Sequence, residues 1–264
     1  MNLLLRSLWH YRGFVLGSVK REFQARYVDS LLGASWAVLN PLAMIVVYTV
    51  IFSQLMQSRL PGVANVFGYS IFLCAGVLIW GLFSEIVSRS AQVFIEHGDL
   101  IKKLSFPRIC LPAIVLAGAL LNFSIIFGLF SVFLVLSGNF PGWSYFSLVP
   151  ILLLVIGFAA GLGLTLGVLN VFFRDVGQAL GVALQFWFWF TPIVYPLSVL
   201  PDWARKWVLM NPMTALVGAC QDILVSGRMP DAAALMVPAL IALALCVLAL
   251  WLVRRRAGEM VDEL

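Results

Sequence analysis

Charged residues are scarce in this sequence. They make up 11% of its 264 residues, whereas 62% of the residues are hydrophobic. A soluble domain has about 25% charged and about 45–50% apolar residues, and the mean hydropathy of this chain is +1.01. So little polar surface cannot cover a core that faces water. Composition therefore excludes a soluble globule and indicates a polytopic membrane protein of the all-α class.

Several kinds of chemical site are also missing. The sequence has neither a GxxxxGK[ST] phosphate loop nor an HExxH pair, the patterns that hold nucleotides and catalytic zinc. Its four cysteines lie far apart without CxxC spacing, which supports neither a metal site nor a disulfide framework. The net charge of +5 does not indicate nucleic acid, because Lys and Arg cluster between apolar runs. We expect no catalytic site, metal or cofactor in this chain.

Charge-free runs locate the membrane spans, because a bilayer core needs about 20 apolar residues in a helix. The run over residues 109–173 is too long for one helix, and its middle, GNFPGW at 138–143, is typical of a turn at the membrane surface. This run is predicted to form a helical hairpin. The sequence thus predicts six transmembrane helices, at residues 33–55, 68–88, 109–137, 147–173, 177–198 and 232–253.

The distribution of Lys and Arg predicts the orientation of these spans. Thirteen of these residues lie before the first span, after the second, after the fourth or after the sixth, and four lie on the opposite side. The positive-inside rule therefore places both termini in the cytoplasm. A seventh span at 207–221 would place the C-terminal run of arginines on the outer side, against the positive-inside rule. This segment also contains Asn211-Pro212. We expect a re-entrant or interfacial helical pair there, on the outer face.

The N-terminal segment is too basic to span the membrane. Leu16, Val19, Phe23 and Tyr27 fall on one stripe of a helix, opposite Lys20 and its polar neighbours. This pattern predicts an amphipathic helix lying along the inner leaflet. The alternative is a basic arm without fixed structure that touches anionic lipid.

Polar and small residues mark two of the predicted spans. Glu85 and Arg89 lie one helical turn apart near the cytoplasmic end of the second span, and we expect them to form an interfacial ion pair. Glycine and alanine recur along residues 157–167 of the fourth span. Such residues allow helices to approach closely, and we expect this stripe to pack inside one subunit, with dimerisation as the alternative.

A pore without its own energy source needs a partner that supplies energy, and residues 89–108 are the candidate contact. From Ser90 the sequence predicts a short cytoplasmic helix, interrupted at Gly98 and ended by Pro107. The candidate residues for coupling to an ATPase are Glu96, His97, Asp99, Lys102, Lys103 and Arg108. The alternative is an ordinary amphipathic loop.

Aromatic residues supply the candidates for a substrate path. In the first span an aromatic, amide or thioether side chain recurs every four residues, and residues 186–190 are five consecutive aromatics. Aromatic rings can stack on the C–H faces of sugars, although they also form interfacial belts and ordinary packing. The candidate channel residues are Trp36, Asn40, Met44, Tyr48, Trp187 and Trp189.

Five short motifs carry a resemblance to a known family. They are NPL at 40–42, LIKKLSFPR at 100–108, FRDV at 173–176, TPIVYP at 191–196 and NPM at 211–213. In this order and spacing they resemble the ABC-2-type permeases that export polysaccharides. The similarity extends over nearly the whole chain and is greatest for permeases that export O-antigen, the lipopolysaccharide side chain, with capsule and teichoic acid permeases next.

This resemblance implies a single transmembrane domain over residues 1–264 that forms a homodimer in the bacterial inner membrane. Two cytoplasmic nucleotide-binding subunits would carry ATP and Mg, and the cargo would be a lipid-linked polysaccharide. The resemblance assigns residues 1–29 to an interface helix, 89–108 to a coupling helix and 196–230 to external gate helices. The implied gate residues are Tyr195, Pro196, Asn211 and Pro212.

Other functions stay open at this point. Within transport, the alternatives are an exporter of capsular polysaccharide or teichoic acid, or an ABC-2 exporter of small hydrophobic compounds. From a different class, an integral membrane enzyme acting on lipid-linked sugars would also be hydrophobic. It would need acids or histidines that converge at one membrane face, and the sequence predicts none.

Overall fold

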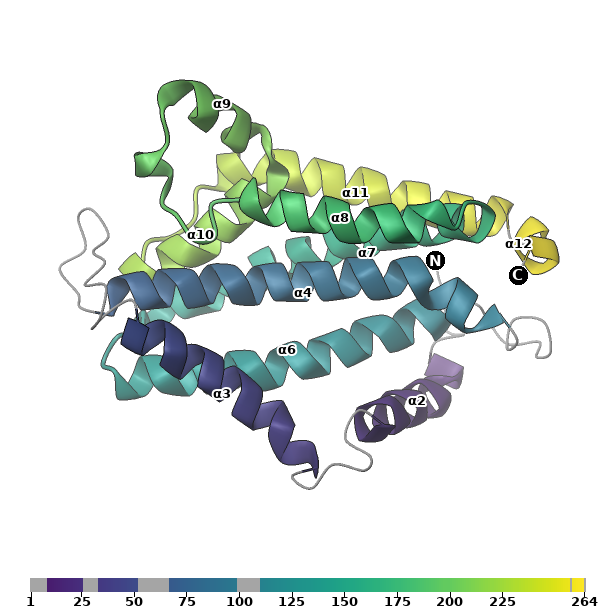
Figure 1. Cartoon of the computed structure of the whole chain (residues 1–264), viewed down its shortest axis with the longest axis horizontal. Helices are drawn as coiled ribbons and strands as arrows, with labels where there is room; N and C mark the ends of the chain where they lie inside the picture. The colour runs from purple at the N-terminus through teal and green to yellow at the C-terminus, as the bar shows by residue number, and fades with distance from the viewer. Residues whose placement is uncertain (1–8, 26–32, 52–66, 99–109, 257, 264) are drawn as a thin grey trace.

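The structure is a computed structural model that describes residues 9–25, 33–51, 67–98, 110–256 and 258–263. Within these residues every regular element is a helix, which confirms the all-α class. The helices long and apolar enough to cross a membrane are α4 (Gly68–Glu96), α6 (Cys110–Leu136), α7 (Leu148–Phe172, preceded by the short helix η3, Gly142–Ser147) and α11 (Ala232–Arg255). All four run along the long axis of the molecule (Figure 1). The chain is therefore a multi-pass membrane protein.

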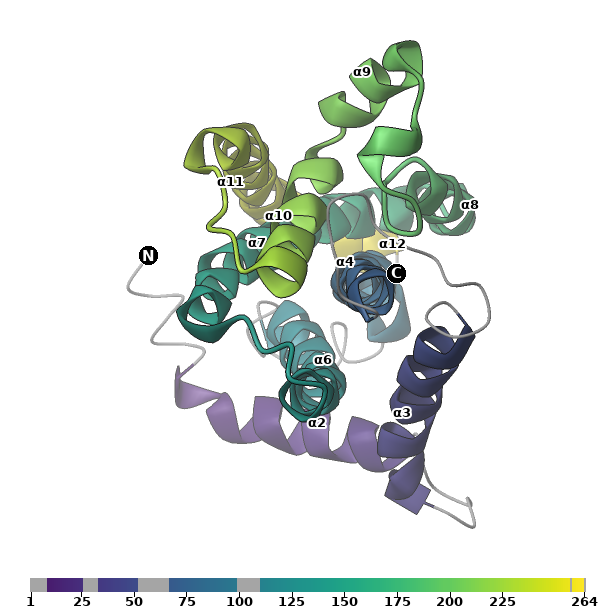
Figure 2. The same cartoon turned by 90° about the vertical axis from the view of Figure 1, so that its left-hand side faces the viewer.

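Helix α4 forms the centre of the bundle. It lies among α6, α7, α10 (Pro212–Ser226) and α8 (Asp175–Trp189), as Figure 2 shows. In the most apolar 18-residue segment of α4, 72% is buried, against 17% in the corresponding segment of α11. The fully buried side chains of α4 include Ile79, Phe83 and Ile86. Helix α11 instead leaves most of its apolar surface open, as expected for a helix that faces lipid.

Glycines let α7 approach two neighbouring helices. A Cβ at Gly163 would lie 3.0 Å from the Val87 Cα of α4, and one at Gly167 would lie 2.5 Å from the Ser90 carbonyl oxygen. On another face of α7, a Cβ at Gly161 would lie 2.7 Å from a backbone nitrogen of α11. The prediction that this stripe packs helices inside one subunit is confirmed.

The predicted boundary between the second span and a separate coupling helix at Ser90 is wrong. Helix α4 continues without a break to Glu96, and His97 follows as its C-cap. No Pro or Gly interrupts residues 82–97, and Ala91 and Phe94 are buried. Packing of these last two turns extends the helix past the apolar run. Residues 99–108, the rest of the predicted coupling region, lie outside the described residues.

The first and fifth predicted spans have different outcomes. The first is helical throughout its described part, from η1 (Gly33–Ser35) through α3 (Trp36–Thr49) to Ile51, and residues 52–55 lie outside the described residues. Helix α8 ends at Trp189 rather than at residue 198. Proline lacks an amide hydrogen and disfavours helical backbone at the preceding residue, so Pro192 ends the helix. A 15-residue helix is about 22 Å long, less than the roughly 30 Å hydrocarbon core.

The remainder of the fifth predicted span, residues 190–198, forms no α-helix, and two helices follow it. After the short turn η4 (Leu197–Val199), α9 (Asp202–Met210) and α10 meet at a bend of 96°. Together they form either a broken span or a re-entrant pair, so the described residues hold four spans, or five if this pair counts as one. The six-span count is therefore not established by helix length.

Helix α2 (Arg12–Ala25) lies across the bundle axis beside α6 (Figure 2). This is the orientation expected of a helix parallel to the membrane plane. Val19 is buried and Leu16 is 66% exposed, so the bundle covers only part of the predicted apolar stripe. Tyr27, the fourth member of the stripe, lies outside the described residues.

Candidate functional site

A groove opens between α3, α4 and α6. Its cavity has a volume of about 310 Å³, and apolar side chains such as Leu78 and Phe123 form most of its wall. Asn40 and Met44, two members of the predicted channel face, line it from α3. Gly81 of α4 faces open space in the groove, since no atom lies within 4 Å of a Cβ built there.

The other two residues of that predicted face lie elsewhere. Tyr48 is partly buried and packs against the hydrophobic core, and its carbonyl accepts a hydrogen bond from Ser70 Oγ at 3.4 Å. Trp36 is 40% exposed at the beginning of α3. The structure therefore brings Asn40 and Met44 into one cavity but not Trp36 and Tyr48, and their channel role stays a prediction.

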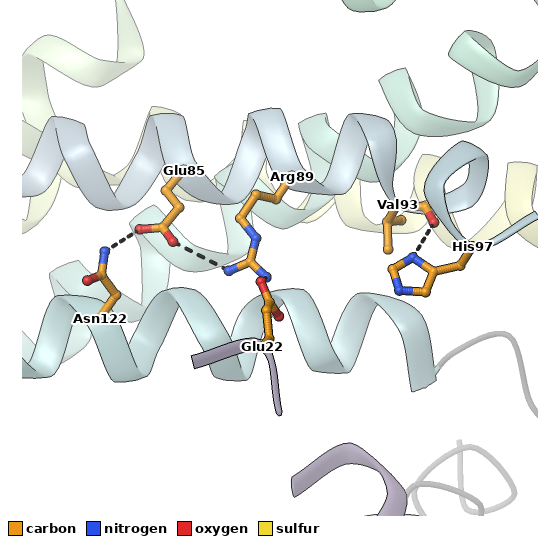
Figure 3. A network of polar contacts seen from close by, with 6 residues as sticks. All are labelled: Glu22, Glu85, Arg89, Val93, His97 and Asn122. Atoms are coloured by element: carbon orange, nitrogen blue, oxygen red, sulfur yellow. Dashed lines mark hydrogen bonds and ion pairs between the residues drawn. The ribbon is translucent and has the colours of Figure 1, made fainter. Parts of the chain in front are cut away.

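A chain of polar contacts begins at one end of the groove (Figure 3). Asn122 Nδ2 on α6 donates to Glu85 Oε2 at 2.8 Å, and Arg89 Nη1 donates to Glu85 Oε1 at 3.4 Å. The second terminal nitrogen of Arg89, Nη2, donates to a carboxylate oxygen of Glu22 on α2. The predicted pair between Glu85 and Arg89 is confirmed, and the network joins three helices.

Sequence reasoning missed Asn122 and Glu22. A signal for Asn122 was available, because it is the single amide side chain in the 109–137 span, and polar side chains at membrane depth usually have partners on another helix. Glu22 offered no comparable signal in a segment already rich in charge. Which face of α2 meets the bundle depends on residues distant in the sequence.

A second cavity lies beyond Arg89, between α2 and the ends of α4 and α6. Its volume is about 620 Å³, and Arg21, Glu22 and Glu96 belong to its polar wall. His97 also lines it, with Nδ1 3.1 Å from the Val93 carbonyl oxygen. Two of the predicted coupling residues, Glu96 and His97, thus lie together. The others are Asp99, Lys102, Lys103 and Arg108, which lie outside the described residues.

At the opposite end of the bundle, Asn211 joins α8 to α10 through hydrogen bonds. Its Oδ1 accepts from Trp187 Nε1 at 2.9 Å and from the Met213 amide at 3.0 Å, which makes it the N-cap of α10. Its Nδ2 donates to Thr191 Oγ1 at 2.9 Å. Pro212 occupies the first turn of α10, where no amide hydrogen is needed. Asn211, a predicted gate residue, thus connects the end of α8 to the start of α10.

The predicted aromatic channel residues of α8 separate onto two faces. Trp187 makes edge-on contacts with Trp80, Phe83 and Phe158, at centroid distances of 5.3–6.2 Å. Trp189 is 59% exposed, and its carbonyl accepts from the Tyr195 hydroxyl at 2.7 Å. Trp187 therefore packs inside the subunit, while Trp189 faces outward at the end of α8.

Gln221 is a further buried polar residue that sequence reasoning missed. It is 3% exposed, and its Nε2 lies 3.2 Å from the Phe72 carbonyl oxygen of α4. The same amide is 3.4 Å from the carbonyl oxygens of Pro192 and Ile193. A Cβ at Gly76 would lie 2.7 Å from this amide, so glycine makes room for it. Gln221 thereby holds α10 against the bundle.

These features define a helical membrane protein with a groove along its bundle and polar contacts at both ends. Residues 15–225 match the ABC-2 type transporter family, and the chain belongs to that family. It is 34% identical over 250 residues to the O-antigen export system permease protein RfbA of Myxococcus xanthus, covering 94% of this chain and 92% of that protein. It is 29% identical to the RfbA of Klebsiella pneumoniae, over 79% of each chain. It is 24% identical to the polysialic acid transport protein KpsM of Escherichia coli, over 92% of this chain and 93% of that protein.

Proposed function

We propose that this chain is the membrane subunit of an ATP-driven transporter that exports lipid-linked O-antigen polysaccharide across the bacterial inner membrane. The observation that carries the proposal is the 34% identity, over nearly the full length of both chains, to a protein named as an O-antigen export permease. Capsular polysaccharide is the second candidate, supported by the lower identity of 24% to a polysialic acid transport protein.

The groove between α3, α4 and α6 is the proposed wall of the polysaccharide path. Three helices of one subunit line it, and Asn40 is exposed at its edge, so a closed channel needs helices from another chain. A second copy of this chain supplies them in the proposed homodimer. An open, mostly apolar wall with few polar groups suits a cargo that slides without one fixed register.

The proposed topology has six spans with both termini in the cytoplasm. The surplus of Lys and Arg at the α2 and α12 (Glu259–Glu263) end of the bundle supports this orientation. Two ATPase subunits, carrying ATP and Mg, are then expected at that end, beside Glu96 and the segment that follows α4. The pair α9 and α10 lies at the other end, where it serves as the proposed external gate.

Leucine at Gly81 tests the path. The added side chain enters the groove without meeting another atom within 4 Å of its Cβ, so the subunit is expected to fold and export is expected to fall. Gly128→Leu is the matched control, because Gly128 on α6 is exposed and its Cβ also has no neighbour within 4 Å. The measurement is ATP-dependent transport of lipid-linked glycans into vesicles that contain the permease and its ATPase.

The outcomes of this experiment are distinct. Normal export by Gly81→Leu would show that the groove is not the path. A wild-type complex that moves capsular glycan but not O-antigen would favour the second candidate, and one that moves neither would contradict the proposed function.

A further inference from the structure

Arg89 is the point at which α2 is held to the bundle. Its guanidinium contacts carboxylates on two helices, Glu22 of α2 and Glu85 of α4 (Figure 3). Asn122 of α6 fixes Glu85 from the other side. The guanidinium therefore has acceptors on both sides, and its orientation is set by groups on three separate helices.

The space that Arg89 occupies exists because residue 118 is glycine. A Cβ at Gly118 would lie 2.9 Å from Nη1 and 3.2 Å from Nη2 of Arg89. Glycine in a helix interior destabilises the helix relative to alanine. Gly118 lies inside α6, so glycine lowers the stability of this helix at the position beside the guanidinium.

Helix α2 packs on α6, but little of its own surface is buried. Among its residues only Val19 is buried, and the cavity of about 620 Å³ separates much of α2 from α4. Side chains of Arg89 and Glu85 are each 21% exposed and that of Glu22 is 35% exposed. Ion pairs with restricted access to water are screened less than surface pairs, so the contact with Glu22 adds to the packing of α2 on α6.

We propose that Arg89 is a positioning residue that fixes α2 against α4 and α6 through Glu22, and that export requires this contact. The second part rests on the proposed function. Arg89 is two turns before the end of α4, the end that leads into the expected ATPase contact. A movement of that end thus reaches α2 through Arg89, and α2 and α4 move as one unit.

The first experiment measures the position of α2 directly. A cysteine at the buried position Val19 is labelled with a membrane-impermeant maleimide, and a parent without this cysteine corrects for the native thiols. Loss of a charge-assisted hydrogen bond is expected to raise the labelling rate about tenfold in Glu22→Gln. Gly118→Ala should give a smaller increase, because its Cβ shifts the guanidinium at the end of a flexible side chain while every charge remains.

The control for Gly118→Ala is Gly128→Ala on the same helix. Nothing lies within 4 Å of a Cβ at Gly128, so this variant gains the same helix propensity without touching Arg89. It should label at the parental rate. Equal labelling rates in Gly118→Ala, Glu22→Gln and the parent would overturn the proposal that Arg89 fixes α2.

The second experiment measures export per ATP hydrolysed in the complex with the ATPase. We expect Gly118→Ala to keep ATP hydrolysis and its melting temperature while the export ratio falls, and Glu22→Asp to retain more export than Glu22→Gln. An unchanged ratio despite faster labelling, or a melting temperature that falls in parallel with export, would overturn the positioning role. A wild-type complex that exports nothing would contradict the proposed function and this second part, whereas the labelling rates decide the first part alone.

Discussion

Replacing Asn211 by alanine removes four side-chain hydrogen bonds at the junction of α8 and α10. The side chain caps α10 at the Met213 amide, accepts from the Trp187 indole, and donates to Thr191 and to the Phe190 carbonyl oxygen. Asn211 is 6% exposed, so water does not easily replace these contacts. The substitution should loosen the junction while the long helices stay folded.

The size of this effect follows from the separate contacts. Loss of an N-cap costs about 1 kcal/mol, and a buried indole N–H left without an acceptor costs about 1–3 kcal/mol. Thr191 contributes little, because its hydroxyl still donates to the Trp187 carbonyl at 2.9 Å. We expect a loss of about 2–4 kcal/mol, which lowers the melting temperature by roughly 4–16 °C in a chain of this size.

The assay combines thermal unfolding in detergent with limited proteolysis of the exposed helix α9. Asn211→Asp is the matched control, since aspartate keeps the cap and the acceptor for Trp187 and loses only the donor to Thr191 and the Phe190 carbonyl oxygen. Asn211→Ala should melt lower and be cut faster in α9 than Asn211→Asp. Equal melting of Asn211→Ala and the wild type, or equal damage by both substitutions, would refute the reasoning.

Two further predictions concern helix packing and topology. Gly167→Ala should lower stability by about 1–3 kcal/mol, because its Cβ would lie 2.5 Å from the Ser90 carbonyl oxygen. Gly157→Ala has open space around its Cβ and should not lower stability. Thermal unfolding of both variants measures the difference, and equal melting temperatures would contradict the close approach at Gly167. A cysteine at Asp202 should be labelled by an impermeant reagent only from the outer face and one at Glu263 only from the cytoplasm; labelling of both from one face would exclude the proposed six-span topology.

The sequence by itself determined the membrane class and three of the four long helices. Hydropathy predicted α6, α7 and α11 to within three residues at each end, because a lipid-facing helix must be apolar along its whole length and the charges that end the run also end the span. It also predicted the pair of Glu85 and Arg89, since two residues one turn apart meet on any helix. The NPM motif marked the turn at which α10 begins, whereas the predicted fifth span ran past the end of α8 at Trp189.

Tertiary structure decided the features that depend on which helix faces meet. Helix α4 extends past its apolar run because Ala91 and Phe94 pack against neighbours, and hydropathy does not register that contact. Arg89 donates to Glu22, which lies 67 residues away in the sequence, and Gln221 donates to the Phe72 carbonyl oxygen, 149 residues away. Trp187 and Trp189 look alike in sequence, yet one packs against Phe83 and the other is exposed. Local periodicity places side chains around one helix axis, but only the packing of separate helices selects the partner that each side chain meets.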